Sequence, residues 1–154
     1  MKFLSLLKIG MNQVARSRHA DTNVIFAVLK SAYYRIHGKK IWAHHHVKIR
    51  GLKNIATTDW LKIGTSPTPF LLSSDKTYLN IKGKLIFKSK YDIGRGCRFV
   101  IGENAVCEFG SGFITADSFF FINYGLKIGD NTGISWNCQF IDDDLHTLSY
   151  EGKQ

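Results

Sequence analysis

Two stretches near the N-terminus carry apolar residues at helical spacing. The first comprises Phe3, Leu6, Leu7 and Val14. The second comprises Val24, Ile25, Val28, Leu29, Ala32 and Ile36, which recur at steps of three and four. Asp21 or Thr22 can cap the start of the second stretch, and Gly38 follows its end. The pattern therefore predicts an N-terminal α-helical segment.

The next stretch, residues 41–55, alternates in part between apolar and polar positions. Val47, Ile49 and Ile55 are its strand-like members, and the run also contains three consecutive histidines at 44–46. Neighbouring residues on an extended chain face opposite ways, so this run alone does not make a three-ligand zinc site. The expectation is a polar, partly exposed strand.

From residue 61 onward helical periodicity disappears and short β-favouring pieces alternate with glycine-containing turns. Apolar residues recur at every sixth position in two series, which are Ile81, Phe87, Ile93, Phe99 and then Ile122, Ile128, Ile134, Phe140. Ile63 precedes Ile81 by three such steps and is therefore in the same phase. The two series are out of phase with each other, which places a slip or short insertion within 101–121.

A hexapeptide period predicts a chain that turns a corner once per hexapeptide and closes a triangular coil after three of them. Glycine, Asn and Asp accept the strained turn conformations at such corners. The pattern favours a mainly β protein, a hexapeptide-repeat parallel β-helix of about five coils behind the helical segment. The predicted division is a basic segment at 1–53 with a strand-like end, followed by a β-helix domain at 54–154. A β-sandwich with chance spacing is the alternative.

Composition adds an asymmetry of charge. The chain has 154 residues and a net charge of +9, and 11 of its 21 basic residues lie within 1–53, beside a single acidic residue, Asp21. Two interpretations remain open for this basic segment: a solvated helix face over the main domain, or a contact of residues 1–40 with an anionic membrane surface. No nucleic-acid recognition motif accompanies the charge, so no nucleic-acid partner is expected.

The N-terminus and the cysteines indicate a cytoplasmic protein. The apolar stretch after Met1 is interrupted by Lys8, no clean cleavage site precedes Arg16, and no apolar run has the length of a membrane span. Cys97, Cys107 and Cys138 are odd in number and form no Cys-x-x-Cys pair, so reduced thiols are expected. The predicted location is the cytoplasm, with peripheral contact at the inner face of the membrane.

Residues 122–146 carry three motifs in sequence: Ile-Gly-Asp-Asn at 128–131, Ile-Ser-Trp-Asn at 134–137, and Asp-x-Asp-x-His ending at His146. Over roughly residues 60–150 the chain resembles the left-handed β-helix O-acetyltransferases, especially the branch that acts on capsular and other surface polysaccharides. The resemblance implies a left-handed β-helix, a homotrimer, acetyl-CoA as co-substrate, a sugar or polysaccharide acceptor, and no metal.

The resemblance also assigns roles to individual residues. His146 would be the general base that takes a proton from the acceptor hydroxyl. Asp144, two residues earlier, would share the face of His146 on an extended segment and hold its imidazolium or contact the acceptor. Asp142 and Asp117 would bind the acceptor, although relatives often have Asn where this chain has Asp117. Trp136 can offer an apolar face to the acceptor sugar or pack against the neighbouring coil. The carboxylates at 142–144 can alternatively form a solvated loop or a cation site.

Two functions follow from these motifs. The first is acetyl transfer from acetyl-CoA to a hydroxyl of a surface-polysaccharide precursor. Relatives continue beyond the histidine with further coils that carry much of the CoA groove, whereas this sequence stops at Gln154. The second is therefore an inactive, truncated β-helix that serves as a structural or interaction module. Zinc-dependent hydration, as in the γ-class carbonic anhydrases, lacks the matching histidine spacing.

Overall fold

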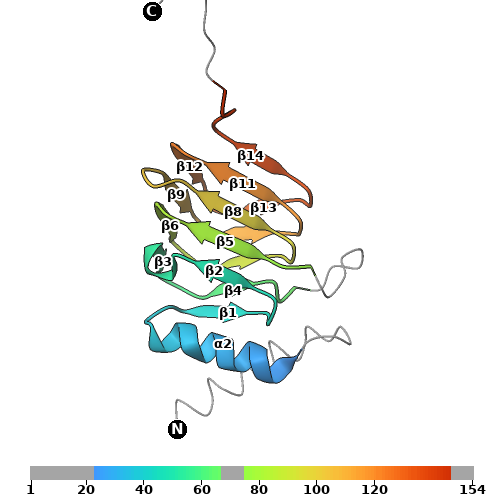
Figure 1. Cartoon of the computed structure of the whole chain (residues 1–154). Helices are drawn as coiled ribbons and strands as arrows, with labels where there is room; N and C mark the ends of the chain where they lie inside the picture. Colours follow the sequence, from blue (N-terminus) through green and yellow to red (C-terminus); the bar gives the residue numbers. More distant parts are fainter. Residues whose placement is uncertain (1–22, 67–74, 147–154) are drawn as a thin grey trace, which may run out of the picture.

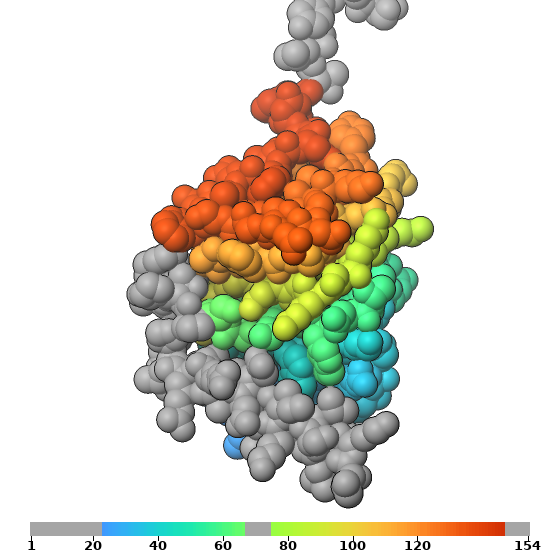
Figure 2. All heavy atoms as spheres, turned by 180° about the vertical axis from the view of Figure 1, so that it is seen from behind, coloured from blue at the N-terminus to red at the C-terminus, as the bar shows by residue number. Residues whose placement is uncertain are grey.

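The computed structural model describes residues 23–66 and 75–146, which form an α-helix followed by a left-handed β-solenoid (Figure 1). All strand pairs are parallel, and each turn of the chain adds one strand to each of three walls. The described strands make about four turns, with five levels on two walls and four on the third. The space-filling view shows the turns as bands stacked in sequence order (Figure 2).

The three walls are named here by the order in which the chain visits them. The first wall contains β1 (Ile41–Ala43), β4 (Leu61–Ile63), β7 (Tyr91–Ile93), β10 (Gly112–Ile114) and β13 (Thr132–Ile134). The second contains β2 (Lys48–Arg50), β5 (Tyr78–Ile81), β8 (Arg98–Ile101), β11 (Phe119–Ile122) and β14 (Gln139–Ile141). The third contains β3 (Ile55–Thr57), β6 (Lys84–Phe87), β9 (Val106–Phe109) and β12 (Gly125–Ile128).

A turn of the solenoid is longer than the expected three hexapeptides. Three hexapeptides after Ile81 the chain reaches Phe99, yet Ile81 pairs with Ile101, and Ile101 in turn pairs with Ile122. The hexapeptide spacing holds only inside a turn, because Ile81, Phe87 and Ile93 end the consecutive strands β5, β6 and β7. The corner that follows the first wall is longer and occupies 94–97, so the period fails there.

The slip expected within 101–121 also has a local cause. The corner from the second to the third wall occupies 102–105, whereas the corresponding corner one turn earlier occupies only 82–83. This insertion shifts the phase of the repeat without disturbing the pairing, since β6 and β9 stay in parallel register.

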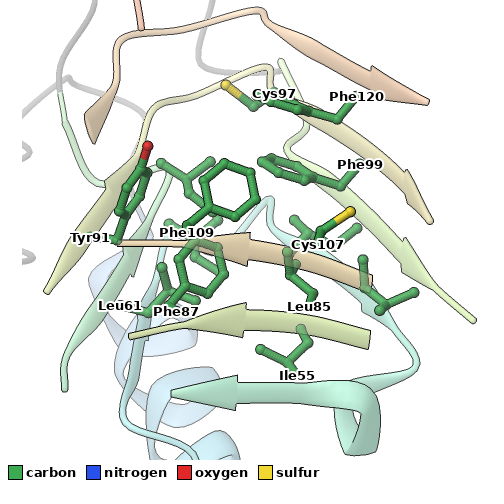
Figure 3. Packing of buried hydrophobic residues seen from close by; sticks show 14 of the residues in the cluster. Ile55, Leu61, Leu85, Phe87, Tyr91, Cys97, Phe99, Cys107, Phe109 and Phe120 are labelled. Carbon is green, nitrogen blue, oxygen red and sulfur yellow. The ribbon is translucent and has the colours of Figure 1, made fainter. Parts of the chain in front are cut away.

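Two residues of each longer strand point into the solenoid and stack on their counterparts in neighbouring turns. Phe99 and Phe120 are fully buried, with ring centroids 4.3 Å apart, and Phe120 stacks on Phe140 at 4.7 Å. Phe87 and Phe109 form a second stack on the third wall, at 5.2 Å (Figure 3). Phe99 thus pairs with Leu79, and Phe140 pairs with Phe120. Neither phenylalanine is stacked with Ile81, whose partner in the next turn is Ile101.

The corner after the first wall explains why Gly, Asp and Asn recur between the apolar stretches of the sequence. Gly96, Asp117 and Asn137 occupy its third position in three successive turns, with φ angles of 78°, 48° and 54°. The left-handed backbone region is costly for most side chains and is tolerated best by Gly, Asn and Asp. The expectation that these residue types take the strained turns is confirmed at this corner.

The predicted second helix is present as α2 (Val24–Ile36). Its N-cap is Asn23, whose side chain accepts a hydrogen bond from the backbone N–H of Phe26 at 3.1 Å, and Gly38 follows the helix with φ 73°. Ala27, Ser31 and Tyr34 are buried against the first turn of the solenoid. The expected first helix, at Phe3–Val14, lies outside the described residues.

The solenoid begins inside the segment predicted at 1–53. β1 and β2 precede residue 54, and they pair with β4 and β5. The basic residues of this segment cap the exposed end of the first turn. Lys30 donates to the carbonyl oxygens of His45 and Val47, Lys39 to that of Ile55, and Lys40 to that of Thr58 at 2.9 Å. Of the two interpretations of the basic segment, these lysines fit a helix packed on the main domain.

The three histidines do not lie on a strand. They form the corner between β1 and β2, and the chain turns there, so alternation does not separate their side chains. The ring centroids of His45 and His46 are 3.9 Å apart, and those of His44 and His46 are 5.6 Å apart. The prediction of an extended, polar strand at this run was wrong because the first solenoid corner falls there.

Candidate functional site

The segment after β14 holds the predicted general base and three carboxylates. The Asp142 carboxylate accepts hydrogen bonds from three successive backbone N–H groups of the corner below, those of Asn123 (2.7 Å), Tyr124 (2.9 Å) and Gly125 (2.9 Å). Burial raises the pKa of Asp142, but these N–H groups together outweigh it and leave the pKa below its usual value. Asp142 therefore satisfies the backbone of the last complete turn.

Asp143 and Asp144 each stabilise the turn that presents His146. Asp143 accepts a hydrogen bond from the side-chain amide of Asn123 at 2.8 Å and one from the backbone N–H of Leu145 at 2.8 Å. Asp144 accepts from the backbone N–H of His146 at 3.1 Å. Leu145 has φ 60°, so the segment is a turn and not the extended piece on which Asp144 and His146 would share a face. The side chains of Asp144 and His146 are exposed.

The described contacts give Asp144 a different task from the expected one. Its carboxylate accepts the backbone N–H of His146, and within residues 23–66 and 75–146 no hydrogen bond joins it to the imidazole. Asp144 consequently positions the backbone that carries the imidazole. The imidazole is exposed and able to approach an acceptor hydroxyl.

Asp117 and Trp136 lie together at the corner after the first wall. The N–H of Asp117 donates to the carbonyl oxygen of Arg95 at 2.9 Å, and that of Asn137 donates to Ala116 at 3.0 Å. These bonds stack the corners of successive turns, which places Trp136 one level above Asp117. The Trp136 side chain is 57% exposed, and Asp117 is also exposed. An exposed carboxylate and an exposed indole on successive corners are side chains that can bind a sugar, which offers hydroxyl donors and an apolar ring face.

Asn137 is a candidate that sequence reasoning did not single out. It occupies the corner position of Asp117 one turn later and is exposed. Its amide can both donate and accept hydrogen bonds, whereas an ionised Asp117 only accepts. The available signal was the recurrence of Gly, Asp and Asn at 96, 117 and 137, which marks one corner of three successive turns.

The structure assembles two groups of predicted residues and keeps them apart. Asp142, Asp144 and His146 follow β14, whereas Asp117 and Trp136 precede strands of the same wall. A strand of three residues spans about 10 Å. Trp136 therefore lies before the start of β14, and the segment that carries His146 begins at its end.

No group of three or more His, Cys, Asp or Glu side chains that could hold a metal ion occurs among the described residues. Cys97 and Cys107 are buried in the core, where burial raises the pKa of each thiol to about 12. Neither thiol is therefore a nucleophile at neutral pH.

One curated relative provides context for this arrangement. The chain is 25% identical over 142 residues to an "Uncharacterized 24.8 kDa protein in cps region" of Klebsiella pneumoniae. The similarity covers 90% of this chain and 64% of that protein, so the chain spans less than two thirds of its relative's length. No protein-family model and no solved structure matches the chain.

Proposed function

We propose that this chain carries the acceptor-side part of an acetyl-CoA-dependent O-acetyltransferase, with a hydroxyl of a surface-polysaccharide sugar or its precursor as the acceptor. Three observations support the proposal: the parallel β-solenoid, the motifs at 122–146, and a relative from a cps region, which points to capsular polysaccharide. The observation that carries it is the exposed His146, presented by a turn whose N–H groups Asp143 and Asp144 accept and which Asp142 joins to the corner at 123–125.

The chemistry requires a base at His146. A sugar hydroxyl is a weak nucleophile until a base removes its proton during attack. The neutral imidazole of His146 accepts that proton as the hydroxyl oxygen bonds to the thioester carbonyl carbon of acetyl-CoA. When the tetrahedral intermediate collapses, the C–S bond breaks and the imidazolium returns the proton to the CoA sulfur. The products are the acetyl ester and free CoA.

The separation of Trp136 from His146 favours an oligomer. In the proposed homotrimer, the corner with Asp117 and Trp136 of one subunit supplies the acceptor surface beside His146 of its neighbour. In that arrangement the acceptor contacts Trp136 of one subunit and His146 of the other, so a single chain does not have to bring both residues to it.

Turnover tests the proposed acetyl transfer, and mixing of variant subunits tests the site proposed to be shared between neighbours. The chain, and a version extended by further C-terminal coils, is incubated with acetyl-CoA and a panel of acidic and neutral oligosaccharides while free CoA is measured. We expect release that His146→Ala abolishes and that Val106→Ala, on the third wall, leaves unchanged. Mixing His146→Ala with Trp136→Ala subunits should restore part of the activity. No CoA release from either version would refute acetyl transfer, and failed restoration between folded variants would refute the shared site.

The second candidate is a non-catalytic solenoid that acts as an interaction module. It is supported by the contacts of Asp144, whose carboxylate accepts the backbone N–H of His146 and has no hydrogen bond to the imidazole among the described residues. Turnover by the 154-residue chain that depends on His146 would exclude it. Binding of a partner or saccharide with no CoA release, from the extended version as well, would favour it.

For location, we propose a cytoplasmic protein with peripheral membrane contact through residues 1–40. None of the described helices is long and apolar enough to cross a membrane. α2 exposes Ile25, Phe26, Leu29, Tyr33 and Ile36, with Ile36 83% exposed, and such a stripe can enter the interface of a bilayer.

Vesicle flotation tests the membrane contact. Anionic phosphatidylserine vesicles should carry more of the chain than neutral phosphatidylcholine vesicles, and Ile25→Ser with Leu29→Ser should reduce flotation on both. Val106→Ser, an apolar-to-polar change on the third wall, serves as the matched control. Equal flotation on the two vesicle types would contradict the electrostatic part, and an unaffected double variant would contradict the role of the stripe.

A further inference from the structure

A groove of about 300 Å³ lies on the outer face of the first wall, away from the turn of His146. Its residues come from three successive turns, because Lys62 of β4 pairs with Asp92 of β7, and Asp92 pairs with Phe113 of β10. The lining is completed by Lys90, Tyr91 and Gly112. The groove therefore runs across the strands, along the solenoid axis.

Asp92 supplies a hydrogen-bond acceptor at this groove. Its Oδ2 accepts from the hydroxyl of Ser66 at 2.9 Å, whereas its Oδ1 is buried and has no hydrogen-bond partner among the described residues. Burial raises the pKa of Asp92, and the Ser66 hydroxyl and the charges of Lys62 and Lys90 offset part of that rise. A buried carboxylate oxygen without a donor is costly, and a ligand hydroxyl would remove that cost.

Phe113 supplies an apolar surface beside this acceptor. Its side chain is 53% exposed although Phe113 is the middle residue of β10, which has neighbouring strands on both sides. The next residue along the wall is Gly133, and a Cβ there would lie 3.0 Å from Cζ of the Phe113 ring. Glycine at 133 thus leaves the space into which the ring packs.

Lys62 and Lys90 give the groove a net positive charge. Neither lysine forms an ion pair with a carboxylate among the described residues, where the pairs are Lys82–Glu103 and Lys88–Glu108. Both lysines line the same groove as Asp92, and their flexible side chains can rearrange around a ligand that donates to this carboxylate. Two ammonium groups around one carboxylate suit a ligand that carries both hydroxyls and an anionic group.

We propose that this groove binds an acidic pyranose of a polysaccharide chain, with its apolar face on Phe113, a hydroxyl donating to Asp92, and its carboxylate near Lys62 and Lys90. The groove lies on a different wall from the segment that leads to His146, so the bound sugar is a distal unit of the chain and not the acetylated one. The identification of the ligand as a polysaccharide rests on the proposed function.

Calorimetric titration of the full chain without acetyl-CoA tests the site separately from transfer. The probe is hyaluronan hexasaccharide, which alternates uronic acid with N-acetylhexosamine, and N-acetylchitohexaose is the neutral comparison. The hyaluronan fragment should bind more tightly. Phe113→Ala should weaken its binding about 3- to 10-fold. Lys62→Met with Lys90→Met should abolish the preference for the acidic fragment.

Two further variants separate the groove from general stability. Gly133→Ala adds one methyl group that displaces the Phe113 ring without changing charge, so it should weaken binding as Phe113→Ala does. Val106→Ala, on the third wall, should leave binding unchanged. No binding of either hexasaccharide, or equal binding by all folded variants, would overturn the groove. Binding with these effects but without CoA release would retain the groove and reject the proposed acetyl transfer.

Discussion

Three consecutive aspartates in the turn before His146 differ in what their carboxylates hold. Asp142 accepts three backbone N–H groups, Asp143 accepts one backbone and one side-chain donor, and Asp144 accepts one backbone donor. A carboxylate that accepts several N–H groups gains more from its charge than one that accepts a single bond. At the scale of the residue, Asp142 is the structural member of the motif.

Replacing Asp142 by Asn tests this assignment. The amide presents one acceptor oxygen and no charge, so the variant should lose about 1 kcal/mol of unfolding free energy at pH 7. Because folding lowers the pKa of Asp142, its contribution is present above the unfolded value of 3.8 and is lost as pH falls. Urea unfolding at pH 7 and pH 3 should show the difference shrinking. Asp144→Asn is the control, and an equal loss there would contradict the assignment.

His44 offers a second pH dependence at the same scale. Burial, followed by the charges of Arg95, His45, His46 and Lys30, lowers its pKa to about 3. The unfolded chain binds this proton near pH 6.5, so stability is full above that value and is lost between pH 6.5 and 3. The slope is about 1.4 kcal/mol per pH unit for one proton.

His44→Asn should flatten that slope, because Asn does not titrate and its oxygen can accept the N–H of His46, as Nδ1 of His44 does at 3.3 Å. The measurement is urea unfolding at several pH values between 4 and 7. Ala32→Asn, a change to the same residue type on the exposed side of α2, should keep the original slope. An unchanged slope in His44→Asn would show that other groups cause the acid sensitivity.

At the scale of the element, α2 acts as the cap of the solenoid. The first strands present carbonyl and N–H groups with no preceding turn to pair with, and unpaired strand edges invite association. Lysine ammonium groups meet several of these carbonyls, and the hydroxyl of Ser31 accepts the N–H of Ala43 at 3.1 Å. The same hydroxyl donates to the carbonyl of Ala27 at 2.8 Å.

Ser31→Ala should therefore destabilise the protein more than an exposed substitution on the same helix. It leaves the N–H of Ala43 buried without an acceptor, which costs about 1–3 kcal/mol. Thermal or urea unfolding measures the change, and Ala32→Ser, on the exposed side of α2, should stay within about 0.5 kcal/mol. Similar stability of the two variants would show that water replaces the Ser31 hydroxyl.

At the scale of the whole molecule, stability is shared between neighbouring turns. The inward residues of each turn contact those above and below, as the stack of Phe99, Phe120 and Phe140 shows. In such an array each turn depends on its immediate neighbours. A core defect should consequently loosen the adjacent turns more than distant ones.

Phe120→Ala tests that expectation. Removal of a fully buried ring between two stacked partners should cost about 3–5 kcal/mol. Hydrogen exchange should accelerate most in β8, β11 and β14 and least in β1 and β4. Phe119→Ala, in the same strand but on its outer face, is the control with a smaller loss. Uniform acceleration across all walls would show a single cooperative unit instead.

The sequence supplied the fold class through one-dimensional signals. Recurring apolar residues beside Gly, Asn and Asp corners indicated stacked parallel coils, and helical spacing indicated α2. The turn length was predicted wrongly, because a hexapeptide period inside a turn says nothing about the longer corner at 94–97. The histidine run was assigned to a strand and lies at a corner, because a corner and a strand can carry the same residue types.

The amino-acid sequence by itself determined which residue types recur and therefore that apolar side chains stack in a coil, since a chain that repeats its apolar positions removes them from water by stacking one turn on the next. It also singled out the motif that ends at His146. Only the tertiary structure decided which residues meet: the carboxylate of Asp142 with three N–H groups of the preceding turn, and Asp92 with Phe113 on the next strand of its wall. The contacts of Asp142 and Asp92 join neighbouring turns of the solenoid, and corner lengths, which no local pattern specifies, set their register.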